Sequence, residues 1–344
     1  MILRVIGVCG LGFTGSGAVT DLLKEYDEIL FNNNFNEFSL CYYTDGLLDL
    51  KHNLVDCPIR FESSDAALYR FQNLVKKTYG SKHFRKSPYN KKIYLACMRY
   101  IEDVTQIKWK GTWGFRLGET RFIKNFLIRV AFKLRRIIGD SFFVKLSSTT
   151  MRFSIRPINF IDRTKELIQD ILHITSNEKE ANKKYYLLDQ AFPGDKPQEC
   201  FVFFEDAKAI VVDRDPRDVY LLSKYDVHAD SSWIPTDNVY KFIDYYRIMR
   251  EHSEYKNENI LRIRFEDIIY NYDSTRNKIE EFLNICNHLN KGKFLDVEKS
   301  VLNTQLFNKY PDESENIKII EKELKEWLFD FSKYERVCSK VKTW

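Results

Sequence analysis

The residues of this chain that could do chemistry gather in two short motifs, each between an apolar run and a helical pattern. The first is the glycine-rich stretch GLGFTGSG at 10–17, and the second is RDPRD at 214–218. Closely spaced glycines let main-chain N–H groups converge on an anion, and a helix that starts there adds partial positive charge. An arginine at a strand end offers a planar fork of donors that suits phosphate. Both motifs therefore predict binding of an anionic ligand.

The glycine-rich stretch matches GxGxxG, the dinucleotide-binding pattern, through Gly10, Gly12 and Gly15. That site needs an acidic residue after the second strand to hold a ribose hydroxyl, but the strand expected at 28–31 runs into asparagines at 32–34. The dinucleotide interpretation, and with it a dehydrogenase, therefore ranks last.

The same stretch can be aligned with GxxxxGK[ST], the phosphate loop of ATPases and kinases. Ser16 then stands in the place of the lysine and Gly17 in the place of the Mg²⁺-binding hydroxyl, which argues against an ordinary ATPase or kinase. A simple tight turn is a third interpretation. We favour an anion-binding loop, because Thr14 and Ser16 add hydroxyl donors at the same place.

The second motif is also a well-specified helix start. Asp215 is a suitable N-cap, Pro216 suits the first helical position, and Asp218 follows three residues after the cap. This explanation leaves out Arg214, whose fixed charge at a strand end suits a phosphate better than a core.

The elements that must position these motifs follow an α/β rhythm. Apolar, β-prone runs predict strands at 3–9, 28–31, 184–189, 207–213 and 259–265. Runs of this kind with intervening helices are typical of a parallel sheet covered on both faces. From about 63 to 180 the pattern is helical without a β-hairpin, and amphipathic helices follow from about 273 to 344. We expect a single α/β domain over 1–344, with a helical insert and a C-terminal helical cap.

Composition excludes several classes of protein. With 344 residues and 44% hydrophobic residues, the chain can bury a real core, so disorder and disulfide miniproteins are excluded. The net charge of +5 is too small for a non-specific nucleic-acid binder, and no nucleic-acid partner is expected. Seven scattered cysteines without a CxxC pair, and no leader or membrane-spanning pattern, predict reduced thiols and a cytoplasmic location.

Taken together, the two motifs resemble those of the PAPS-dependent sulfotransferases (PAPS is 3′-phosphoadenosine 5′-phosphosulfate), in particular bacterial members that act on polysaccharides. In that family a loop after the first strand cradles the 5′-phosphosulfate, and a later RxPxD-like element binds the 3′-phosphate. The stretch at 259–285, with Arg264, Glu266 and Asp267, is similar to the family's late strand and helix. The resemblance covers roughly 3–40 and 184–310. It implies a P-loop-type three-layer fold with a central parallel sheet.

The resemblance implies a donor-binding set in the two motifs: Gly12, Phe13, Thr14, Gly15, Ser16, Gly17, Ala18, Arg214 and Ser223. Two positions depart from the family pattern. Gly15 stands where the family usually has a lysine or arginine. Ser223 lies nine residues after Arg214 instead of eight, which turns a helix by about 100°.

Sulfuryl transfer needs in-line oxygens, donors for the spreading negative charge and a base for the acceptor hydroxyl. It needs no metal. Carbohydrate-directed members of the family have a glutamate shortly after the second strand, and Glu37 is in a similar position; Asp189 is the second candidate.

The resemblance therefore implies a transferase that moves the sulfuryl group of PAPS to a carbohydrate hydroxyl and releases PAP, the desulfated nucleotide. The acceptor would be a polysaccharide or a lipid-linked glycan. Two alternatives stay open: another P-loop nucleotide-dependent kinase, and a catalytically degenerate protein that binds nucleotide or glycan.

The segment at 120–139 is both basic and apolar. It carries six cations and no acid between Glu119 and Asp140. A core helix with a solvated outer face explains this pattern, and so does peripheral contact with a membrane or an anionic polysaccharide.

Overall fold

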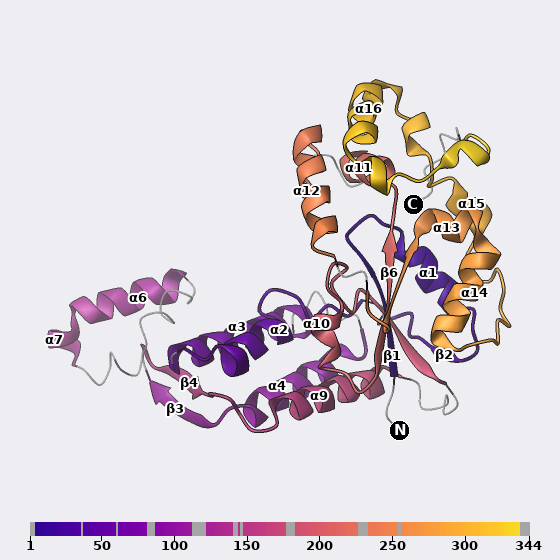
Figure 1. Cartoon of the computed structure of the whole chain (residues 1–344). Helices are drawn as coiled ribbons and strands as arrows, with labels where there is room; N and C mark the ends of the chain where they lie inside the picture. Colours follow the sequence, from indigo (N-terminus) through magenta and orange to yellow (C-terminus); the bar gives the residue numbers. More distant parts are fainter. Residues whose placement is uncertain are drawn as a thin grey trace. The chain divides into compact units, whose positions relative to one another are not determined.

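The computed structural model describes residues 4–35, 37–59, 61–80, 87–111, 122–139, 144, 147–176, 183–225, 233–253 and 256–337. The chain divides into two compact units. The first comprises Met1–Cys41 and Thr175–Trp344, and the second comprises Tyr42–Ile174 (Figure 1).

The first unit is built on a five-stranded sheet in the order β2-β5-β1-β6-β7, and every neighbouring pair is parallel. The strands are β1 (Arg4–Gly10), β2 (Ile29–Leu30), β5 (Tyr185–Asp189), β6 (Ala207–Asp213) and β7 (Ile260–Arg264). All five lie within one residue or so of the predicted apolar runs. The predicted α/β class with a central parallel sheet is confirmed.

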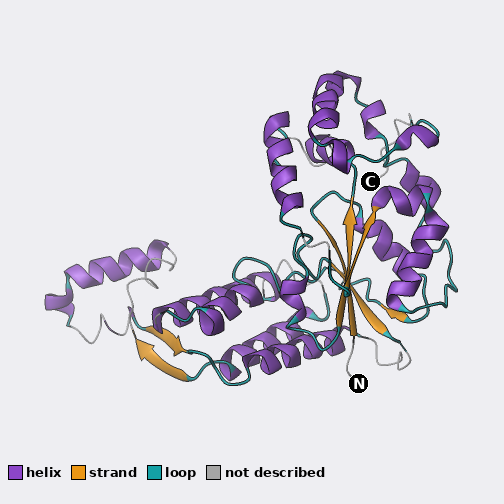
Figure 2. Ribbon diagram, in the orientation of Figure 1, coloured by secondary structure: helices purple, strands orange, loops and turns teal. Residues whose placement is uncertain are grey.

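The first unit also contains helices and short helical turns, some beside the sheet and some beyond the ends of its strands (Figure 2). They are α1 (Ser16–Leu23), α10 (Gln198–Phe201), α11 (Pro216–Tyr225), α12 (Val239–Glu251), α13 (Phe265–Tyr270), α14 (Tyr272–Leu283), α15 (Val297–Val301), η2 (Leu306–Asn308), η3 (Pro311–Glu313), α16 (Ser314–Glu323), η4 (Lys325–Trp327) and η5 (Phe331–Lys333).

One face of the sheet is covered by α1, α13 and α14. Ile6 and Val8 of β1 and Ile210 of β6 are fully buried there, in one cluster with Leu22 of α1 and Ile279 of α14. Another cluster joins α11, α12 and α16, which Figure 1 places beyond the arrowhead of β6. The motif at 214–218 therefore lies between the sheet and this second cluster.

The second unit is mainly helical: α2 (Leu47–Lys51), a π-helical turn η1 (His52–Asp56), α3 (Phe61–Tyr79), α4 (Asn90–Asp103), α6 (Phe122–Lys133), α7 (Arg135–Ile138) and α9 (Phe160–Thr175). It also contains an antiparallel pair, β3 (Ile107–Gly111) with β4 (Thr149–Phe153). This strand pair was not predicted, but it is not a β-hairpin, since residues 112–148, with α6 and α7 among them, separate β3 from β4. β3 alternates apolar and polar residues over only four positions, Ile107 to Lys110, and β4 (TTMRF) does not alternate, so neither run is long enough to mark a strand in the sequence.

The helical insert was expected at about 63–180, and the second unit spans 42–174. That the chain folds as one domain with a C-terminal cap stays a prediction. None of the described helices combines the length and the apolar character that crossing a bilayer requires. The six cysteines within the described residues are free thiols, and Cys338 lies outside them.

Candidate active site

The loop between β1 and α1 has the backbone of an anion-binding site. Gly12, Phe13 and Gly15 have positive φ angles of 97°, 54° and 81°. α1 begins at Ser16 with no side-chain cap from the described residues, and its first turn has no acidic residue. The N–H groups at the start of α1 therefore face no competing carboxylate of their own helix, and the helix dipole favours an anion there.

Gly15 shows why this loop has no lysine. Its φ of 81° is rarely adopted by other residues, and a Cβ on Gly15 would lie 2.5 Å from Cδ2 of Phe265. A lysine would force both the loop and the first residue of α13 to move. By contrast, a Cβ on Gly17 would have no atom within 4 Å. The departure from the family pattern at Gly15 follows from the packing of the loop on α13.

An exposed aromatic ring lies against the loop. The ring of Trp233 is stacked with that of Phe13, with centroids 5.9 Å apart and planes inclined by 20°. A Cβ on Gly12 would lie 2.1 Å from Cη2 of Trp233. Trp233 is 64% exposed, so it offers an aromatic face at the loop on which a base can stack. Sequence patterns did not identify Trp233 as part of this site.

The two carboxylates predicted as bases come together. Glu37 forms an isolated parallel bridge with Asp189, and the N–H of Phe38 donates to the carbonyl of Asp189 at 3.0 Å. The next residue, Gln190, donates from Nε2 to Oγ of Ser16 at 2.9 Å. The carboxylate pair therefore lies beside the start of α1.

Asp189 has the environment of a proton acceptor. Burial, and then the negative charge of Glu37, raises the pKa of Asp189 to about 6. Its Oδ1 is buried and has no hydrogen-bond partner among the described residues. Glu37 is exposed. A carboxylate whose pKa lies near the working pH and that has an unused oxygen is suited to general base catalysis.

Arg214 connects the loop to the C-terminal segment. Its guanidinium donates from Nη1 to the carbonyl of Phe13 at 3.1 Å and from Nη2 to the carbonyl of Asn303. It also lies 4.6 Å from the ring centroid of Phe265, the ring that packs on Gly15. Because Arg214 is 2% exposed, contact with a phosphate would require it to exchange these carbonyls for the ligand.

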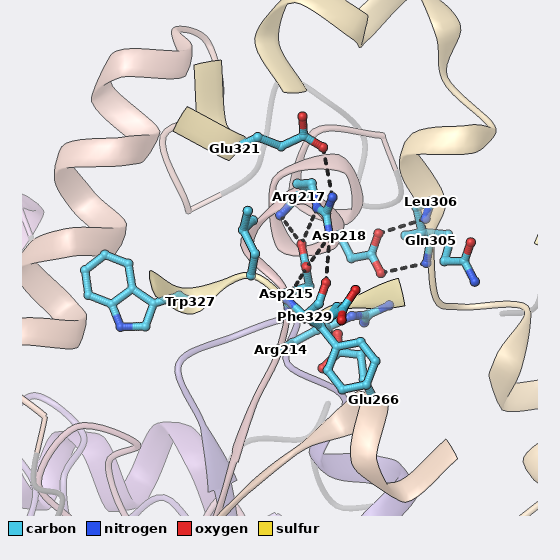
Figure 3. Close-up of polar contacts among 12 residues, drawn as sticks. Arg214, Asp215, Arg217, Asp218, Glu266, Gln305, Leu306, Glu321, Trp327 and Phe329 are labelled. Carbon is cyan, nitrogen blue, oxygen red and sulfur yellow. Dashed lines mark hydrogen bonds and ion pairs between the residues drawn. The ribbon is translucent and has the colours of Figure 1, made fainter. Parts of the chain in front are cut away.

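Asp215 caps α11 as predicted. Its Oδ1 accepts from the N–H of Arg217 at 2.9 Å, and its Oδ2 accepts from Nη2 of Arg217 and from the N–H of Phe329, both at 2.8 Å (Figure 3). The N–H of Asp215 itself donates to Oε1 of Glu266 at 2.9 Å. The main-chain N–H of the capping residue Asp215 thus finds its acceptor on α13. This contact forms because β6, which leads to Asp215, lies next to β7, which leads to α13.

Asp218 holds the C-terminal segment. Its carboxylate accepts from the N–H groups of Gln305 and Leu306 at 3.0 and 2.7 Å (Figure 3). Burial raises the pKa of Asp218 to about 7, and it raises the pKa of Glu266 to about 8, assisted by the charge of Asp215. Asp218 and Glu266 therefore serve the structure, and burial holds their pKa values well above the usual range of carboxyl groups.

Ser223 is fully buried within α11. A second cation besides Arg214 lies at this end of the sheet. Lys309, which is half-buried, lies close enough to Arg214 and Asp218 for their charges to act on it, and burial lowers the pKa of Lys309. No pattern around Lys309 distinguishes it in the sequence.

Similarity to known proteins was found at the level of structure. No protein-family model matches the chain, and no curated protein matches it significantly. Sulfotransferase STF9 from Mycobacterium avium aligns over 97% of this chain and 78% of its own, at 11% identity and a TM-score of 0.36. The sulfotransferase domain of the Synechococcus PCC 7002 olefin synthase aligns over 83% of this chain and 75% of its own, at 10% identity and a TM-score of 0.33. At these values the similarity does not identify the substrates of this chain.

The described residues contain no group of three or more His, Cys, Asp or Glu side chains placed to hold a metal ion. The candidate site brings together main-chain N–H donors, hydroxyls, a carboxylate pair, the buried Arg214 and the half-buried Lys309. This set can hold an anionic donor and take a proton from an acceptor.

Proposed function

We propose that this protein transfers a sulfuryl group from PAPS to a hydroxyl of a carbohydrate. The observation that carries the proposal is the position of the Glu37–Asp189 pair beside the anion-binding loop, through the hydrogen bond from Gln190 to Ser16. Group transfer to a hydroxyl requires a base next to the site of the transferred anion. A kinase loop would need a lysine at position 16, where this chain has Ser16.

The residues present fit such a donor. The loop from Gly12 to Ala18 supplies main-chain N–H groups and the hydroxyls of Thr14 and Ser16 for the 5′-phosphosulfate. Arg214 and Lys309 are two neighbouring cations for the 3′-phosphate, which would take the place of the carbonyls that they now contact, those of Phe13, Asn303 and Leu302. When bound, PAPS supplies a sulfuryl group joined to a good leaving group, and PAP is the other product.

Within this proposal Asp189 takes the proton from the acceptor hydroxyl, and Glu37 keeps Asp189 basic. Glu37 ranks first by sequence, but its carboxylate is exposed, whereas Asp189 has a buried, unused oxygen and a pKa of about 6. The negative charge of Glu37 is one cause of that pKa. The two carboxylates thus act as one unit, with different roles.

Calorimetric titration with PAP, AMP, ATP with Mg²⁺ and NADH tests the donor. We expect PAP to bind more tightly than AMP, because only PAP carries the 3′-phosphate. Lys309→Gln should lower the affinity for PAP by about 10-fold or more, the usual loss for a charged hydrogen bond. The affinity for AMP, which has no 3′-phosphate, should not change. Lys318→Gln, at an exposed position on α16, is the matched control. Equal affinity for PAP and AMP would rule out a 3′-phosphate site.

The pH dependence of sulfuryl transfer from PAPS to a sugar tests the base. Activity should rise with pH through about 6, as Asp189 loses its proton. Asp189→Asn should lower turnover by about 10²–10⁴-fold with little change in PAP affinity. Glu37→Gln should move the midpoint of the pH–activity curve to lower pH, since it removes a charge that raises the pKa of Asp189. A midpoint that both variants leave unchanged would assign the proton transfer to another group.

A further inference from the structure

The segment formed by α6 and α7 exposes apolar side chains that a folded protein normally buries. Phe126 and Leu127 of α6 are 58% and 48% exposed, and Ile137 of α7 is 83% exposed. Ile128 and Ala131 of α6 are buried. The apolar character of α6 therefore extends beyond the side that packs on the protein, and the remainder faces solvent.

The same segment concentrates positive charge. Residues 120–139 carry six cations without an acid, one more than the net charge of the whole chain. Among the described side chains, Arg129, Lys133 and Arg136 are exposed beside the apolar ones. We call the surface made by Phe126, Leu127, Arg129, Lys133, Arg136 and Ile137 the basic apolar surface.

This combination selects one kind of partner. A nucleic acid would use the cations and could stack a base on Phe126, but it would gain nothing from the exposed leucine and isoleucine side chains. A second copy of the chain, meeting through the same surface, would bring two sets of the cations Arg129, Lys133 and Arg136 together. An anionic bilayer uses both features, since apolar side chains enter the boundary between headgroups and acyl chains and cations face the lipid phosphates.

We propose that the basic apolar surface docks on an anionic lipid membrane. Phe126, Leu127 and Ile137 enter the interface, and Lys133 and Arg136 contact the phosphates. The proposal does not depend on the transfer reaction. Because it concerns the second unit and the proposed transfer concerns residues of the first, either one can fail alone.

Vesicle flotation with the full chain tests it, using phosphatidylcholine vesicles with and without phosphatidylglycerol. We expect flotation only with the anionic vesicles, weakened by salt. Lys133→Gln/Arg136→Gln should lower the affinity by about 30-fold, given the usual contribution of a basic residue at such a surface. Lys91→Gln/Lys92→Gln, the same charge change at exposed positions on α4, should leave it unchanged.

The apolar part is tested by Phe126→Ser/Ile137→Ser, which should abolish flotation even at low salt. Leu95→Ser/Leu289→Ser, at positions 53% and 73% exposed, is the control. Circular dichroism and the unfolding temperature show that each variant is folded, and PAP titration shows that its nucleotide site is unchanged. The proposal is wrong if the wild type stays with the soluble fraction, if neutral vesicles bind equally well, or if both control pairs lose flotation too. It is also wrong if the apolar variant instead dissociates a dimer seen by size-exclusion chromatography.

Discussion

The carboxyl ends of the neighbouring strands β1 and β6 both carry polar groups, but the polar groups differ in kind. After β1, the loop at 10–17 contains no charged residue, and its polarity comes from main-chain N–H groups and two hydroxyls. After β6, Arg214, Asp215, Arg217 and Asp218 are four charged residues within five positions, all buried. The first end is shaped by backbone angles and the second by side-chain charge.

This difference decides which of the two motifs keeps its polar groups available for a ligand. The charges after β6 are bound by the protein: Asp215 by Arg217 and Phe329, and Asp218 by Gln305 and Leu306. They tie the C-terminal segment to the sheet. Among the described residues, the side-chain hydrogen bonds to the loop after β1 go to the carbonyl of Phe13 and to Oγ of Ser16, so the main-chain N–H groups of the loop remain for an anion. A run of charged residues is therefore weaker support for a ligand site than a run of glycines at a helix start.

Removing a charge after β6 should have the largest effect on stability. Asp215→Ala leaves Arg217 buried without its nearest carboxylate and removes the cap of α11. We expect a loss of about 3–5 kcal/mol in the free energy of unfolding, measured by urea denaturation. Asp273→Ala, at an 81% exposed side chain, should change it by less than about 0.5 kcal/mol. A small effect at Asp215 would mean that Glu321 or solvent replaces it.

Changing the backbone after β1 should have a smaller effect on stability and a larger one on binding. Gly15→Ala forces a residue with a Cβ to adopt a φ of 81° against Phe265, at a cost of about 1–3 kcal/mol. PAP affinity should fall because the N–H groups of the loop are displaced. Gly17→Ala, where a Cβ meets no atom within 4 Å, should be neutral or stabilising by up to about 1 kcal/mol. If both variants bind PAP equally, the loop geometry is not what holds the anion.

The smallest effect at a single pH is expected for a variant of an acid that is already protonated in the fold. The pKa of Asp218, about 7, and that of Glu266, about 8, are both raised above their unfolded values. The folded state therefore binds more protons than the unfolded state between about pH 4 and 8, so stability should fall as pH rises through that window. Glu266→Gln should flatten part of this slope while changing stability little at pH 6, where the glutamate is already neutral. Thermal unfolding at several pH values measures the slope of stability against pH and the stability at pH 6. If the variant keeps the slope of the wild type, Glu266 is ionised in the folded protein.

Local patterns in the chain were sufficient for much of this protein. Apolar runs identified the five strands of the parallel sheet, and the glycines at 10–17 identified a loop between a strand and a helix. Asp215 and Pro216 identified the start of α11. These features depend on neighbouring residues only: on φ preference, on capping and on the length of an apolar run.

Contacts between distant residues were decided by the tertiary structure. Gln190 reaches Ser16 across 174 positions, and Glu266 accepts from Asp215 across 51. Both depend on the strand order β2-β5-β1-β6-β7, which no local pattern encodes. The same holds for the pairing of the exposed strand β3 with β4, and for Lys309 beside Arg214. Burial, which raises the pKa of Asp189 and closes position 15 to a lysine, exists only once the sheet and α13 have packed together.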